Sequence, residues 1–187
     1  MTVVPLSAGH GDALVAFFRD LPAGDRTFIK EDVTDPAAVR AWSAEPAGRH
    51  RWVAVERADR DGADSTVLGY VAVLPLAGWS DHVGEVRLVV APAARGTGLG
   101  RELARHALVQ AVEAGLRKLV VEVVPDQGPA LALFSGLGFT GEALLRDQIR
   151  DRDGQLRDLM VLAHHVGDTW SGMTAVGVAD ALAEPAD

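Results

Sequence analysis

A run of six residues, Arg95-Gly96-Thr97-Gly98-Leu99-Gly100, constrains the fold of this chain more than any other stretch. It follows an apolar, strand-like segment and precedes a helix-like segment from Arg101 to Ala114. Alternating glycines let the backbone turn tightly and leave no side chains over it. The free N–H groups of such a turn can point at one anion, to which the helix dipole and Arg95 add positive charge. The run therefore predicts a phosphate or pyrophosphate cradle at a strand-to-helix turn.

The spacing of the glycines excludes two better-known phosphate loops. A Walker A loop needs a Gly-Lys-Ser or Gly-Lys-Thr ending, and no Lys-Ser or Lys-Thr pair occurs in this chain. The dinucleotide fingerprint G-x-G-x-x-G fails because position 101 holds Arg. What remains is R-x-x-G-x-G, formed by Arg95, Gly98 and Gly100. A glycine-rich turn without a ligand is the structural alternative.

This pattern resembles motif A of the GNAT superfamily of acyl-CoA-dependent N-acetyltransferases. The preceding segment Leu88-Val89-Val90-Ala91-Pro92 is similar to the strand that leads into that family's loop. The later segment from Ala130 to Phe139, ALALFSGLGF, is similar to the family signature A-x-x-L-Y-x-x-L-G-F. Both motifs occur in the family's order, and together they cover Glu85 to Phe139.

The periodicity of the chain predicts a mixed α/β fold. The resemblance implies six or seven strands and about four helices in one domain over residues 1–165. The small residues of 166–187, which end in acidic residues and proline, predict a partly helical or frayed tail. Tyr70, the only tyrosine, is predicted to be a core or sheet residue. The expected strands are 3–6, 52–56, 67–74, 84–90, 118–124, 139–149 and 156–164, and the expected helices are 12–21, 36–42, 99–114 and 129–137. The β-branched run 118–124 predicts a strand that is buried on both faces.

Charge and composition narrow the class of partner. A formal net charge of −8 disfavours nucleic-acid binding and is compatible with an amine-bearing substrate. The chain has no cysteine, which excludes disulfides, thiolate metal sites and an acyl-cysteine intermediate. No apolar run reaches the length of a membrane span, and no signal peptide is visible. A cytoplasmic location without membrane contact is therefore expected.

The resemblance implies acetyl-CoA as co-substrate and no metal. It places the pantetheine arm along the strand that ends in Leu88, Val89 and Val90, where two parallel strands splay, with a backbone amide near Val90 polarising the thioester. The remaining implied cofactor-binding residues are Arg95, Gly96, Thr97, Gly98, Leu99, Gly100, Gln127 and Phe134. Gln127 stands where the family has asparagine, and Phe134 stands where it has tyrosine.

Two residues are candidates for the catalytic base. Glu85 lies among apolar residues on the strand before the loop, and partial desolvation there would raise its affinity for a proton. The alternative is a glutamate at the solvated end of the strand, paired with Arg87. His82 is the second candidate, because imidazole titrates near neutral pH.

The hypothesis that follows is an N-acetyltransferase that moves an acetyl group directly to a primary amine in a ternary complex. The acceptor is a small molecule or a protein lysine, and a homodimer is left open. Phe134 cannot protonate a leaving thiolate, as the family's tyrosine does. The rival hypothesis is therefore a non-catalytic acyl-CoA-binding sensor.

Overall fold

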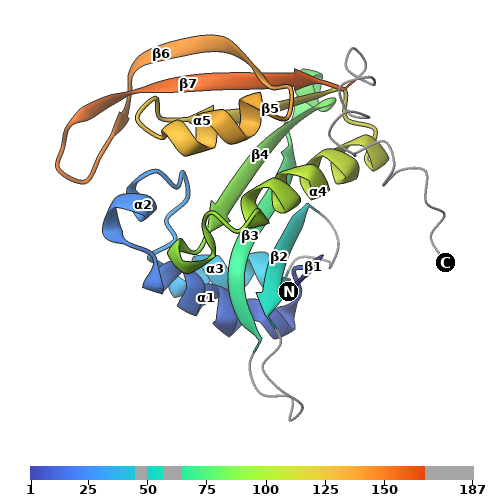
Figure 1. The fold of residues 1–187 in the computed structure, drawn as a ribbon, viewed down its shortest axis with the longest axis vertical. Helices are drawn as coiled ribbons and strands as arrows, with labels where there is room; N and C mark the ends of the chain where they lie inside the picture. The colour runs from blue at the N-terminus through green and yellow to red at the C-terminus, as the bar shows by residue number, and fades with distance from the viewer. Residues whose placement is uncertain (45–49, 57–64, 167–187) are drawn as a thin grey trace. The chain divides into compact units, whose positions relative to one another are not determined.

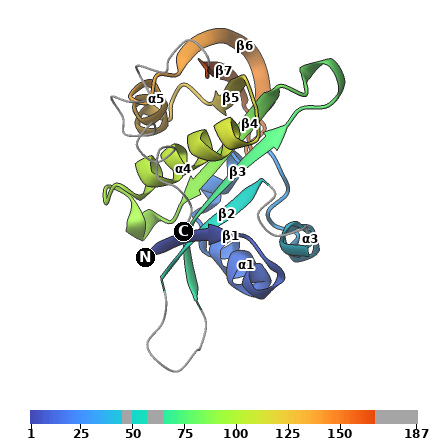
Figure 2. The same cartoon turned by 90° about the vertical axis from the view of Figure 1, so that its right-hand side faces the viewer.

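The computed structural model describes residues 1–44, 50–56 and 65–166. Figures 1 and 2 show its elements in two views. The chain forms two compact units: unit 1 contains Met1–Ala72 and Leu88–Leu103, and unit 2 contains Val73–Arg87 and Ala104–Asp187. The domain boundary predicted at residue 165 stays a prediction, and the predicted tail lies, from residue 167 on, outside the described residues. In the described ranges no helix is long and apolar enough to cross a membrane.

A mixed sheet runs through the described part of the chain, in the strand order β1-β2-β3-β4-β5-β7-β6. The pair β4 and β5 is parallel, whereas β1–β2, β2–β3, β5–β7 and β6–β7 are antiparallel. The predicted mixed α/β fold is confirmed, because the chain combines helices with a sheet that has both parallel and antiparallel pairs. The strands are β1 (Thr2–Pro5), β2 (Arg51–Glu56), β3 (Thr66–Pro75), β4 (Val83–Val90), β5 (Lys118–Val123), β6 (Thr140–Arg150) and β7 (Leu156–His165).

The predicted helices also form, and one further helix was not predicted. Asp35 is the clearest start signal, since its carboxylate accepts the Ala37 N–H at 2.8 Å just as α3 begins. The missed helix, α2, has five residues and too short an apolar pattern to detect. The helices are α1 (Gly11–Asp20), α2 (Ala23–Thr27), α3 (Pro36–Ala44), α4 (Leu99–Glu113) and α5 (Gly128–Ser135), with 3-10 turns η1 (Ala8–His10), η2 (Gly78–Ser80) and η3 (Pro92–Ala94).

An aromatic cluster forms part of the core of unit 1. The ring of Phe18, on α1, meets Trp42 of α3 and Tyr70 of β3 edge-on, with centroids 5.7 and 5.6 Å away. Arg51 lies over the Trp42 ring and donates a hydrogen bond to the Tyr70 hydroxyl. Tyr70 is buried, which confirms its predicted place in the core. Figure 2 shows α1 close to β1 in this unit.

Strand β5 of unit 2 corrects one expectation. Its burial alternates, with Leu119, Val121 and Val123 buried and Glu122 exposed, so it is covered well on one face only. The apolar run wrongly predicted burial on both faces, because Val120 lies on the other face, which is only half-buried. Figure 1 shows α5 running alongside β5 and β7.

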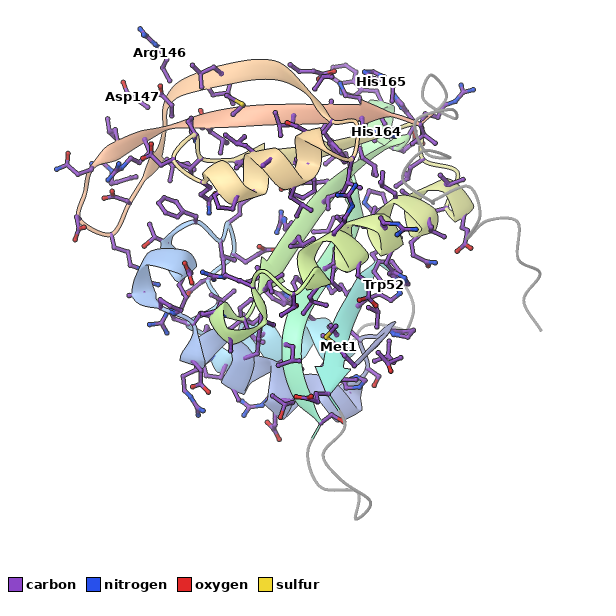
Figure 3. All side chains as sticks on the ribbon, viewed as in Figure 1. Met1, Trp52, Arg146, Asp147, His164 and His165 are labelled. Atoms are coloured by element: carbon purple, nitrogen blue, oxygen red, sulfur yellow. The ribbon has the colours of Figure 1, made fainter. Side chains whose placement is uncertain are left out.

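Strand β6 ends the sheet and is exposed along almost its whole length. Its register with β7 shifts twice, between Gly141 and Ala143 and between Leu145 and Ile149. Asp147 adopts a φ of 51° and donates its N–H to the Asp158 carboxylate at 3.0 Å. Bulges and outward charges discourage pairing with another sheet edge. Figure 3 shows Arg146 and Asp147 projecting outwards from this strand.

His164 and His165 end β7 and point to opposite faces, because side chains alternate along a strand (Figure 3). His164 is 2% exposed and stacks beside Phe139, whereas His165 is exposed and lies 3.3 Å from a Glu142 carboxylate oxygen. The two rings therefore do not face one metal ion. The described residues contain no group of three or more His, Cys, Asp or Glu placed to hold a metal.

Burial of His164 predicts a loss of stability in mild acid. Burial is the main cause that lowers the pKa of His164 below 6.5, because it disfavours the charged ring; the neighbouring His165 lowers it further, and a hydrogen bond involving Gly138 partly opposes this. The unfolded chain then binds more protons than the folded chain below about pH 6.5, so stability falls as the pH drops through that range. We expect Tm to fall less steeply between pH 7.5 and 5.5 in His164→Asn than in the unaltered protein. An unchanged slope would contradict this, and exposed His82→Asn is the control.

Candidate functional site

The glycine run forms the predicted strand-to-helix turn within unit 1. Strand β4 ends at Val90, η3 follows, and α4 begins at Leu99. Gly96 and Gly98 have φ values of 75° and 94°, a region that residues with a Cβ rarely adopt. A Cβ on either glycine would meet nothing within 4 Å. The turn therefore needs glycine for its backbone conformation and leaves open space above it.

Most backbone N–H groups of this turn make no hydrogen bond to the residues that the structure describes. The Gly98 carbonyl accepts the N–H groups of Arg101 and Glu102, at 3.0 and 3.1 Å. The five N–H groups of residues 96–100, by contrast, have no acceptor in the part of the chain that the structure describes. They lie at the start of the fifteen-residue helix α4, where the dipole is positive. A row of free donors at this place fits an anion such as a pyrophosphate.

The side chains of the turn mostly support the turn itself. Leu99 is buried in the core, and the Thr97 hydroxyl donates to the Ala94 carbonyl at 2.7 Å. Arg95 donates from Nε and Nη2 to the Val90 carbonyl at 3.3 and 3.2 Å, and from Nη2 to the Asp25 carboxylate at 2.6 Å. Arg95 thus closes the loop onto the end of β4. Asp25, on α2, was not predicted, and its distance of seventy residues from Arg95 explains why no local pattern could reveal it.

The strand before the turn is less buried at its end. Leu88, Val89 and Val90 are each half-buried. The Ala91 N–H, just after them, is taken by the Leu68 carbonyl at 2.9 Å. In unit 2, the parallel register of β4 with β5 pairs Val83 to Glu85 with Lys118 to Val120, although both strands continue further. This is compatible with the splayed strands that the resemblance implies.

Glu85, the first candidate base, has one feature from each interpretation of the sequence: it is buried, and it is paired with Arg87. Its side chain is only 11% exposed, and it is paired with Arg87. Arg87 Nε lies 3.1 Å from Oε1 of Glu85, and Nη2 lies 3.4 Å from Oε2. Residues two apart on a strand share a face, which brings the two side chains together. Burial also lowers the pKa of Arg87, an effect that the charge of Glu122 opposes. The part of β4 in unit 2 therefore carries a desolvated carboxylate with a cationic partner.

His82, the second candidate base, is exposed and lies just before β4. Its side chain is 51% exposed, and Nδ1 is 3.9 Å from an Asp81 carboxylate oxygen. Its carbonyl accepts the Arg117 N–H at 2.8 Å. The backbone is thus fixed while the ring remains open to solvent. It offers a titratable group without the burial of Glu85.

Gln127 and Phe134 belong to α5 and its start, in unit 2. The Gln127 side-chain carbonyl accepts the Val124 N–H at 3.3 Å, so it helps hold the turn before the helix. The Phe134 ring is 3% exposed and packs edge-on against Phe139, with centroids 5.2 Å apart. Phe134 therefore contributes to the core of this unit. The cofactor contacts expected for both residues stay predictions.

Comparison with known proteins agrees with this arrangement. The model of the acetyltransferase (GNAT) family matches residues 15–139. Streptothricin acetyltransferase from Streptomyces lavendulae is 32% identical, over 62% of this chain and 64% of that protein. The chain thus spans just under two thirds of that relative's length.

Solved structures share the fold, and two of them illustrate the likeness. A GCN5-related N-acetyltransferase from Kribbella flavida is 27% identical with a TM-score of 0.72, covering 88% of this chain and 96% of that one. A structure from Salmonella typhimurium, solved with its cofactor acetyl-CoA, has a TM-score of 0.70 at 20% identity. It covers 89% of this chain and 94% of that one. At 20% identity, the likeness to the structure from Salmonella typhimurium supports the fold alone.

Proposed function

This chain belongs to the acetyltransferase (GNAT) family, and we propose that it transfers an acetyl group from acetyl-CoA to a primary amine within a ternary complex. The observation that carries the proposal is the row of unpaired N–H groups at residues 96–100, over which the two positive-φ glycines leave open space. These donors suit the pyrophosphate of CoA in number and charge. They anchor the co-substrate without any metal ligand.

The chemistry then needs a base and a polarised carbonyl. The amine nitrogen attacks the thioester carbon, a C–N bond forms, and the C–S bond breaks. The CoA thiolate that leaves takes up the proton that the attacking nitrogen loses. We assign removal of the ammonium proton to Glu85, with His82 as the second candidate, and polarisation of the carbonyl to a backbone N–H near Val90. No cysteine is present to form an acyl-enzyme, which favours direct transfer.

The acceptor is proposed to be an amine-bearing small molecule, and a protein lysine is the alternative. The relative from Streptomyces lavendulae is named for streptothricin, a single acceptor rather than a class of proteins. The net charge of −8 favours a cationic acceptor over an anionic one. A cytoplasmic location remains part of this proposal.

A thiol-release assay tests the function. The chain is incubated with acetyl-CoA and a panel of amines that includes aminoglycoside-like polyamines, amino acids and a lysine peptide. Amine-dependent release of CoA thiol, with acetylated product seen by mass spectrometry, is expected for at least one acceptor. Binding of acetyl-CoA without transfer to any amine would favour the sensor, for which the absence of a hydroxyl at Phe134 is the supporting observation.

A further inference from the structure

The Arg95 side chain is held at two points, and both belong to unit 1. The carbonyl at one point, Val90, is only five residues away and closes the loop. The carboxylate at the other point, Asp25, comes from the short helix α2 and makes the shortest contact, 2.6 Å. Two anchors on one guanidinium fix its plane as well as its position, because the group is rigid and planar.

The contacts with Val90 and Asp25 leave some N–H donors of the Arg95 guanidinium unused. A guanidinium has five N–H donors: one on Nε and two on each Nη. The contacts to Val90 and Asp25 involve Nε and Nη2. Nη1 has no acceptor among the described residues, and about half of the side chain is exposed. The fixed guanidinium thus presents its two Nη1 donors outside the contacts that hold it.

We propose that Asp25 is a positioning residue for CoA binding: it holds Arg95 so that Nη1 can donate to a phosphate oxygen beside the glycine turn. This inference rests on the proposed function, since it takes the turn as the CoA phosphate site. Arg95 directly precedes the N–H row in the sequence, and the same anion is therefore assigned to its guanidinium and to that row. Orientation of a guanidinium before binding reduces the entropy lost when the phosphate arrives.

A competing interpretation of the same contact makes the opposite prediction. Asp25 could instead act as a counterion that neutralises Arg95 and must be displaced by the phosphate. Removing the carboxylate would then increase CoA affinity. The positioning role requires a decrease, so the sign of the change decides between the two.

The experiment measures CoA binding by calorimetry in the unaltered chain, Asp25→Asn, Arg95→Ala and the double variant. Asp25→Asn is expected to weaken CoA binding about two- to tenfold, the range for an oriented surface ion pair. Arg95→Ala is expected to weaken it at least as much. The double variant should match Arg95→Ala, because Asp25 acts through Arg95. Asp20→Asn, which removes an exposed ion pair with Arg19 on α1, is the matched control.

A second readout separates positioning from a general structural effect. KM for acetyl-CoA should rise in Asp25→Asn with kcat nearly constant, whereas KM for S-acetylpantetheine, which has no pyrophosphate, should not change. The inference is overturned if Asp25→Asn leaves CoA binding unchanged or makes it tighter. It is also overturned if adding Asp25→Asn to Arg95→Ala weakens CoA binding as much as Asp25→Asn does alone. If the unaltered chain binds CoA but transfers nothing, the proposed enzyme fails while the calorimetry still decides this inference. No CoA binding at all overturns both.

Discussion

Replacement of Gly98 by aspartate is expected to abolish CoA binding, with an affinity loss of about 100-fold or more and a Tm that falls only modestly. The new carboxylate would occupy the open space above the turn, where a pyrophosphate is proposed to bind. Like charges placed together in an interface cost several kcal/mol. The φ of 94° strains any side chain by about 1–3 kcal/mol, which accounts for the modest fall in Tm.

Two control variants separate charge from strain. Gly98→Ala carries the same backbone strain without the carboxylate, and it should lose far less affinity. Gly154→Asp places the same residue at a φ of 79° with no atom within 4 Å, in the turn between β6 and β7. It should leave CoA affinity unchanged. Calorimetry that finds wild-type affinity in Gly98→Asp would show that the turn does not bind the phosphates.

The fold and the turn could be predicted because their signals are local. Alternating apolar residues and glycine positions define β4, the turn and α4 within some thirty residues, and each feature follows from backbone preference. The positive φ values at Gly96 and Gly98 are what the glycine spacing requires. The same locality explains the correct placement of Tyr70 in the core, since β3 is strongly apolar around it.

The parts that could not be predicted depend on contacts between distant residues. The Asp25–Arg95 pair joins a five-residue helix to the turn, and neither residue carries a pattern that names the other. The partial burial of the second face of β5 depends on what packs there, which composition does not specify. Whether Glu85 is desolvated or paired could not be decided from sequence, and the structure shows both at once.

Replacement of Glu85 by glutamine is expected to lower kcat by about 100- to 10,000-fold near neutral pH, the usual contribution of a general base. Glutamine keeps the size of the side chain but cannot accept the ammonium proton. CoA affinity should change little, since the N–H row that is proposed to bind CoA is on the loop after β4. The deficit should shrink as the pH rises, because more of the acceptor is then already a free amine. The measurement is the pH profile of kcat and of kcat/KM for the acceptor.

The paired environment of Glu85 calls for a control that also breaks an ion pair. Glu142→Gln removes a carboxylate 2.6 Å from Lys118 in the same unit and should leave kcat unchanged. Glu85→Gln also leaves the half-buried Arg87 with a weaker partner, so Tm and CoA affinity must be measured beside the rates. The base is His82 if Glu85→Gln keeps the wild-type pH profile of kcat while His82→Ala loses the rise of kcat with pH. A large loss in Glu85→Gln that pH does not alter would instead indicate that the carboxylate orients the acceptor, because free amine would not compensate for misplacement.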